Sequence, residues 1–337
     1  AASAASMGAS VAAFAGPAVA LFAVDAIGRM FGGNKKLGGA EMIPVIGGFL
    51  AGLFGRGPLK QKETQLTGDV GAEGLLSGYL TTNFKAKGGL LVGSKRDFAG
   101  VNLLTGSAET DNGKLQSVAD SMVKYAQGLA LQINESVKST TTSLRSLSDT
   151  LGLSTKPLDD FKHSINLISE SGKALTDQQI ADEIAKISDE MVRSLLPSID
   201  SFAKVGETSA QTISRLGAEF SALEAGAQNL GATAGYANEL IKSMSFEARS
   251  AFVDQAGGID ALLQKTGYFF DNFLTPAEQM ALKSNQLSVA LKKLGVSADL
   301  TMDQFKKLVQ STSTSNDLRI GLLGLAQAFY EVKNAQG

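Results

Sequence analysis

The sequence predicts a mainly α-helical protein with a minor β component, and three observations lead to this fold class. A stripe of apolar residues spaced three and four apart runs from Leu115 to Leu151, as in one long helix. Three Thr residues stand three positions before Glu or Gln, which is the capping-box pattern that starts a helix. Only residues 56–108 mix Gly with β-branched and aromatic residues at strand length.

Residues 1–55 form the first predicted region, an apolar helical hairpin. The chain is uncharged from Ala1 to Val24, and a second uncharged run covers 42–54. At about 1.5 Å per residue, a helix over 11–30 could just cross a hydrocarbon layer of about 30 Å, whereas 42–54 is too short. The candidate membrane segment consists of Phe14, Val19, Leu21, Phe22, Ile43, Val45, Ile46, Phe49, Leu50, Leu53 and Phe54.

Two alternatives stay open for this hairpin: a pair of buried core helices, or a membrane-active segment that is sheltered until it is needed. A secretory signal peptide fits poorly, because no basic region precedes the apolar run. The sequence also lacks an initiating Met, which suggests an excerpt of a longer protein.

Charge and cysteine content exclude several classes of site. The 31 basic residues nearly balance the 33 acidic ones, so bulk nucleic-acid binding is not expected. Residues 34–100 hold nine Lys or Arg against five Asp or Glu, which suits a membrane-proximal, phosphate-facing or merely solvated segment. Without cysteine there is no disulfide, thiol nucleophile or cysteine metal site, and we expect no cofactor.

Residues 56–108 are predicted to be a small β-rich unit. Strand-like stretches at 62–68, 76–85 and 89–93 predict a meander of two to four strands, with a hairpin turn at 85–89. Gly88–Lys95 resembles a phosphate-binding loop, but its Ser94 and Lys95 stand in the wrong order.

Residues 109–155 are predicted to be a long helix with a heptad-like seam that Gly152 ends. A narrow stripe on such a helix favours self-association, although packing within the same chain explains it equally well. The seam consists of Leu115, Val118, Met122, Tyr125, Leu129, Ile133, Val137, Leu144, Leu147 and Leu151.

Two further regions follow, a strand with amphipathic helices at 156–256 and a carboxy-terminal helical module at 257–337. Residues 161–168 predict an isolated strand, and the only histidine, His163, is expected to have an ordinary surface or strand role. Capping boxes predict helices that start near 177, 276 and 302. The aromatic cluster at 268–274 is expected to pack in the core.

The stretch Gly257–Met280 resembles the carboxy-terminal region of tail tape measure proteins of long-tailed bacteriophages. That region typically has a Gly-Gly-Leu-Asp start, an aromatic run ending in Asn-Phe, and a cap with Glu. The resemblance continues at 305–309 and 322–329, and upstream at Leu196-Pro197, Gly206-Glu207, 212–216, 43–47 and 54–56. It therefore covers most of residues 40–332, but the long repetitive ruler of the family is missing.

The resemblance implies a structural role at the tail tip and in the tube lumen, and no enzyme activity. The implied partners are further copies of the chain, as a homotrimer, and the tail-tube and distal tail-tip proteins. During infection the implied location is the host inner membrane, which DNA crosses without sequence-specific binding. Apolar segments stored inside a protein tube can move into lipid without long exposure to water.

Two other functions compete with this interpretation. A pore-forming toxin would also place an apolar hairpin among amphipathic helices. A peptidoglycan-cutting enzyme would need a catalytic Glu-Ser close to Gly-Leu-x-Gln, yet Glu170-Ser171 and Gly324–Gln327 are far apart in sequence. The Ser-x-x-Lys matches at Ser121 and Ser201 lack their companion motifs.

Overall fold

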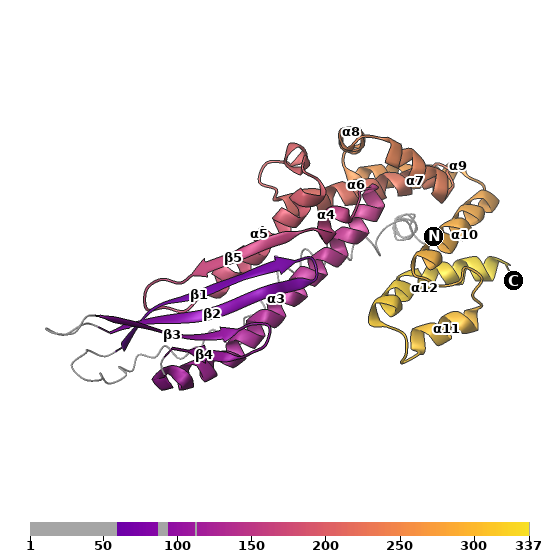
Figure 1. Cartoon of the computed structure of the whole chain (residues 1–337). Helices are drawn as coiled ribbons and strands as arrows, with labels where there is room; N and C mark the ends of the chain where they lie inside the picture. The colour runs from indigo at the N-terminus through magenta and orange to yellow at the C-terminus, as the bar shows by residue number, and fades with distance from the viewer. Residues whose placement is uncertain (1–58, 87–93, 112, 337) are drawn as a thin grey trace. The chain divides into compact units, whose positions relative to one another are not determined.

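The computed structural model describes residues 59–86, 94–111 and 113–336 (Figure 1). This part of the chain is mainly helical with one antiparallel sheet, so the predicted fold class is confirmed at that level. It divides into two compact units. We call residues 59–144 and 154–197 the sheet unit, and residues 145–153 and 198–336 the helical unit. The predicted regions 56–108 and 109–155 therefore share one unit over most of their length.

The sheet has five strands in the order β4-β3-β2-β1-β5. Its strands are β1 (Leu59–Gly71), β2 (Gly74–Ala86), β3 (Lys95–Asn102), β4 (Ala108–Thr110) and β5 (Lys162–Ile168). Strands β1 to β4 form the expected meander, but β5 pairs with β1 from Gln65↔Ile168 to Gly71↔Lys162. The prediction of an isolated strand is therefore wrong, because the open edge of β1 accepts the returning chain. The predicted strand at 89–93 lies outside the described residues, and β3 begins at Lys95.

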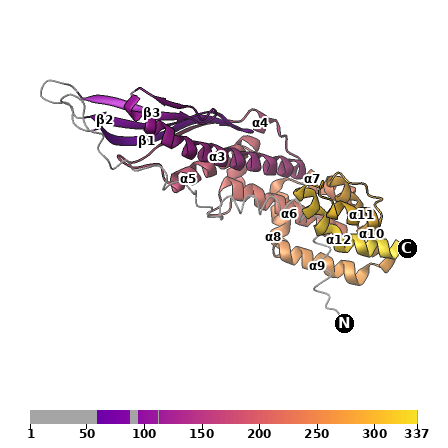
Figure 2. The same ribbon diagram turned by 90° about the horizontal axis from the view of Figure 1, so that it is seen from below.

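One face of the sheet is buried by helices α3 (Gln116–Leu151) and α5 (Asp177–Leu195), as Figures 1 and 2 show. Apolar side chains alternate inward along the strands, for example Leu66, Leu80 and Val101. Thr64 and Thr82, which are cross-strand partners on this face, join their hydroxyls at 3.1 Å. Short elements connect the unit: η2 (Gly113–Leu115) before α3, and α4 (Lys156–Asp159) before β5.

Local signals set the helix boundaries as expected. Helices α5, α10 (Pro276–Lys293) and α11 (Met302–Gln310) begin at the predicted positions, each with a complete capping box on Thr176, Thr275 or Thr301. Thr208 provides a fourth capping box, which the sequence analysis missed, at the start of α6 (Ser209–Asn229). Gly152 follows α3 with φ of +75°, a conformation that suits glycine at a helix end.

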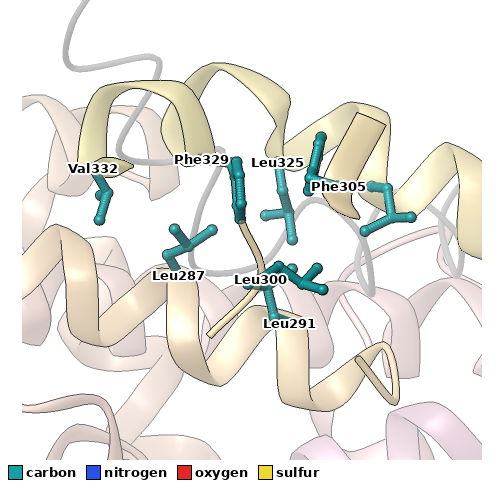
Figure 3. Close-up of a cluster of buried hydrophobic side chains, with 8 residues drawn as sticks. Leu287, Leu291, Leu300, Phe305, Leu325, Phe329 and Val332 are labelled. Carbon is teal, nitrogen blue, oxygen red and sulfur yellow. The ribbon is translucent and has the colours of Figure 1, made fainter. Parts of the chain in front are cut away.

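The helical unit contains only helices in its described part. Helix α6 lies against η3 (Ile199–Phe202), α7 (Ala234–Ser243), α8 (Phe246–Ala256) and α9 (Ile259–Phe273). Helices α10 and α11 pack with α12 (Asn316–Gln336) around a second cluster. Figure 3 shows this cluster, in which the rings of Phe305 and Phe329 stack at 4.2 Å. Its buried members are Leu287, Leu291, Leu300, Phe305, Leu322, Leu325, Phe329 and Val332.

Candidate interaction surfaces

The stretch that carries the family resemblance forms a corner between α9 and α10. Gly257 and Gly258 precede α9 with φ of 97° and 99°, values that disfavour residues with a side chain. Thr275 then begins α10 through a capping box with Glu278. The Gln279 side chain closes the corner, because its Nε2 donates to the carbonyl oxygens of Phe270 at 2.9 Å and Leu274 at 3.0 Å. The capping box of Thr275 and the hydrogen bonds of Gln279 thus hold the corner.

The aromatic residues of α9 divide between core and solvent. Phe270 is 1% exposed, whereas Tyr268 is 65% and Phe273 is 67% exposed. The ring of Phe273 stacks on that of Phe269 with centroids 5.0 Å apart. The expectation of core packing is therefore confirmed for Phe270 and wrong for Tyr268 and Phe273.

The spacing of residues along α9 explains why Phe270 is buried and Tyr268 is exposed. Leu262, Thr266 and Phe270 are buried and four residues apart, so they lie on one face of α9. A Cβ added at Gly226 of α6 would lie 3.4 Å from Thr266 and 3.7 Å from Leu262, so α9 packs closely on α6 there. The Asn229 amide donates to the Thr266 hydroxyl at 3.3 Å. Tyr268 falls on another face of the helix. Phe273 follows Thr266 by seven residues and therefore lies close to the buried face, but it is the last residue of α9 and its ring is mostly exposed. Both residues leave exposed aromatic side chains within Gly257–Met280.

Helix α12 shows a similar division between two faces. Leu322, Leu325 and Phe329 are buried against α10 and α11 (Figure 3). Ile320, Leu323 and Tyr330 lie on the opposite side, and each is between 53% and 56% exposed. The helical unit therefore presents apolar side chains on α12 as well as on α9.

The outer face of the sheet carries polar side chains around Asp69, together with exposed apolar residues such as Ile168. Asp69 accepts hydrogen bonds from the Ser164 hydroxyl at 2.7 Å and the Ser77 hydroxyl at 3.0 Å, and these bonds lower the pKa of its carboxyl. Gln65 and Asn166 pair across the neighbouring position. Such a face is typical of an antiparallel sheet with one solvated side.

A charged network lies inside the helical unit. Arg215 donates to Glu207 and Glu219, both at 2.8 Å, and Glu219 accepts from the Ser250 hydroxyl. The hydrogen bond from Arg215 is the largest cause that lowers the pKa of Glu207. Because these groups satisfy one another and bring α6 and α8 together, we interpret the network as structural.

Arg249 is a second buried cation, 4% exposed. It donates to the carbonyl oxygens of Ile241 at 2.9 Å and Lys242 at 3.2 Å, near the end of α7. Its guanidinium carbon lies 5.1 Å from the ring centre of Phe220 and 4.9 Å from that of Phe246. Burial lowers its pKa, and the carbonyl and ring contacts stabilise the charge in place of a carboxylate.

All ten seam residues are buried in the single chain, each 7% exposed or less. They include Leu129 and Ile133, at 1% each, on the side of α3 that covers the sheet. The seam is therefore used inside the chain, which is the alternative that the sequence left open. Trimerisation stays a prediction, but these side chains are not free to mediate it. Tyr125 also belongs to the seam, and burial raises the pKa of its phenol to about 12.

His163 has an environment that the sequence did not predict. The ring is on the inner face of β5, with Nδ1 2.6 Å from Glu190 Oε2 and Nε2 2.7 Å from Glu183 Oε1. Both carboxylates come from α5 and stand seven residues apart, two helical turns along one face. The seven-residue spacing of Glu183 and Glu190 can be read from the sequence, but the packing of α5 against β5 cannot.

One small cavity lies within the sheet unit. A cavity of about 10 Å³ between the sheet, α3 and α5 would hold one water molecule at most. In the same residues, clusters of His, Asp and Glu that could hold a metal are not found. Nor does any described helix combine the length and apolar character needed to cross a membrane. The candidate membrane segment at 11–54 lies outside the described residues.

Comparison of the chain with protein-family models, curated proteins and solved structures finds no match.

Proposed function

We propose that this chain is a non-enzymatic structural protein of a phage tail, equivalent to the carboxy-terminal part of a tape measure protein. It is housed at the tail tip and in the tube lumen, acts in tail assembly, and is released on infection to help DNA cross the host inner membrane. The sequence resemblance over residues 40–332 is the basis of this proposal.

One structural observation supports the proposal most directly. Within Gly257–Met280, some residues that carry the resemblance have clear roles in the fold: Gly257 and Gly258 turn the chain, Phe270 fills the core, and Thr275 caps α10. Tyr268 and Phe273 have no such role, since most of each side chain is exposed. Large aromatic side chains held outward on a fixed corner are typical of protein interaction sites.

The proposed partner of this α9 surface is another protein of the tail tip. Exposed Tyr and Phe side chains bury a large area for little conformational entropy when a partner covers them. The Gln279 contacts and the α10 capping box hold the corner before binding, which reduces the ordering cost further.

Mass spectrometry of the virion would test the proposal. The chain should be found in purified particles of the phage that encodes it, and should leave those particles when genome ejection is triggered. Its absence from virions, or its retention in emptied ones, would contradict the proposal. Release of soluble muropeptides from peptidoglycan by the pure protein would instead support the enzyme alternative.

A paired substitution tests the α9 surface. Phage carrying Tyr268→Ser and Phe273→Ser should assemble at least about tenfold fewer infectious particles if a partner covers both rings. Phe252→Ser is the matched control, because Phe252 is an aromatic residue of α8, 52% exposed, outside the stretch Gly257–Met280. Equal titres for both variants would rule out the α9 surface.

A further inference from the structure

His163 lies between two carboxylates in the sheet unit. Its side chain is 5% exposed, that of Glu183 is 12% exposed, and that of Glu190 is 38% exposed. The ring nitrogens approach the two carboxylate oxygens to 2.7 and 2.6 Å. These distances are typical of charge-assisted hydrogen bonds.

Each of the two contacts needs a proton. A ring nitrogen without hydrogen would direct its lone pair at an ionised oxygen, which is repulsive at this separation. Neutral imidazole carries one N–H and satisfies one contact, whereas imidazolium carries two and satisfies both. Two neighbouring carboxylates also favour the cation.

We propose that His163 is held as an imidazolium between Glu183 and Glu190, and that its deprotonation weakens the attachment of α5 to β5. The site is therefore a pH-sensitive latch on the edge strand of the sheet. This proposal does not rest on the proposed tail function, and it depends only on contacts within the sheet unit.

The neighbouring elements carry other charged groups. On β1 these are Lys60, Lys62, Glu63 and Asp69, of which Asp69 binds serines on the opposite face, and on β5 Lys162 is exposed. The charges on α5 are Asp177, Asp182, Lys186, Asp189 and Arg193, those on the described part of α3 within the unit are Asp120, Lys124, Glu135 and Lys138, and those on α4 are Lys156 and Asp159. The ring contacts themselves are with Glu183 and Glu190.

Other polar contacts also hold α5 in place. Gln179 donates to the carbonyl oxygen of Ile168 at 3.2 Å, near the start of α5. Farther along, Ser188 contacts Thr140 of α3 at 3.4 Å. The small cavity beside Glu183 is lined by Ile180, Ile184 and Ile187 of α5, so van der Waals contact with the sheet is incomplete there. Opening at the latch would expose these three isoleucines.

Nitrogen NMR of the imidazole tests the protonation state. His163 is the only histidine in the chain, so the assignment is unambiguous. At about pH 7.5 both ring nitrogens should be protonated in the folded protein, whereas the ring should be neutral in concentrated urea. A neutral ring with a single tautomer in the folded protein at this pH would overturn the proposal.

Hydrogen exchange of the full chain tests the mechanical consequence. After correction for intrinsic exchange, protection of α5 should fall by up to about tenfold per pH unit once the ring loses its proton, while α6 serves as an internal reference. Glu183→Gln should remove this dependence, because an amide can donate to a neutral ring nitrogen.

Asp182→Asn is the matched control on the same helix. Asp182 is exposed and accepts from Gln178 at 2.7 Å, so this variant should keep the wild-type pH profile. If Glu183→Gln and Asp182→Asn give the same profile as the wild type, the latch does not govern the opening of α5.

Discussion

The sheet unit and the helical unit use their apolar residues differently. In the sheet unit, the stripe of α3 as far as Leu144 and the inward positions of the strands are buried. Five large apolar residues are exposed in the described part of that unit, whereas the short helices of the helical unit bury one face and leave eleven exposed. These are Val205, Leu230, Tyr236, Leu240, Phe252, Tyr268, Phe273, Met302, Ile320, Leu323 and Tyr330.

The difference shows that a strong apolar pattern does not by itself identify an interaction surface. The α3 seam runs along the longest described helix, and all of its side chains are buried within the chain. The aromatic residues of α9 belong to a shorter helix, and two of them are exposed. Surfaces left over after folding are the better candidates for partner binding.

The largest expected effect separates two phenylalanines of α9. Phe270→Ala should lower the free energy of unfolding by about 3–5 kcal/mol, because it removes a fully buried ring. Phe273→Ala should change it by less than about 0.5 kcal/mol, because the ring is mostly in water. Urea unfolding followed by circular dichroism measures both. Similar losses for the two variants would show that Phe273 is part of the core.

A second pair tests the seam of α3. Ile133→Ala should cost about 2–5 kcal/mol at any protein concentration, because the contacts that it loses lie within one chain. Leu131→Ala, at a position that is 59% exposed, should stay within about 0.5 kcal/mol. If the cost of Ile133→Ala disappeared on dilution, the seam would be holding separate chains together.

A third pair concerns glycine in the two units. At Gly68 of β1, an added Cβ would lie 2.4 Å from the carbonyl oxygen of Ser77, which is backbone of β2. Gly68→Ala should therefore destabilise the sheet unit by about 1–3 kcal/mol. Gly324→Ala in α12 meets no described heavy atom within 4 Å and should stabilise the helical unit by about 0.5–1 kcal/mol. Thermal unfolding with a probe for each unit distinguishes the two signs.

The smallest expected effect is a pH dependence in the sheet unit. Burial, with a smaller effect of the charge of Asp177, raises the pKa of Tyr125 to about 12, from about 10 in the unfolded chain. The unfolded phenol therefore ionises first, and stability is lost as the pH rises above about 10. Tyr125→Phe should reduce this alkaline loss by at most about 2 kcal/mol, as measured by urea unfolding at a series of pH values. An unchanged alkaline slope in the variant would assign the loss to other groups.

Sequence by itself determined the local features of this protein. The starts of α5, α10 and α11 depend on a Thr and a residue three positions later, so they could be predicted from a few adjacent residues. The extent of α3 was predicted from the apolar spacing along the helix, and its end from Gly152. The meander of β1 and β2 was also predictable, since consecutive strands usually pair.

Only the tertiary structure decided which surfaces meet. Strand β5 pairs with β1, and His163 lies between Glu183 and Glu190. These contacts join residues that are far apart in the sequence, and no local pattern predicts them. Likewise, the burial of the α3 seam and the exposure of Tyr268 depend on which face of each helix finds a neighbour. Hydrogen bonds between near neighbours are encoded locally, whereas burial is a property of the whole packed chain.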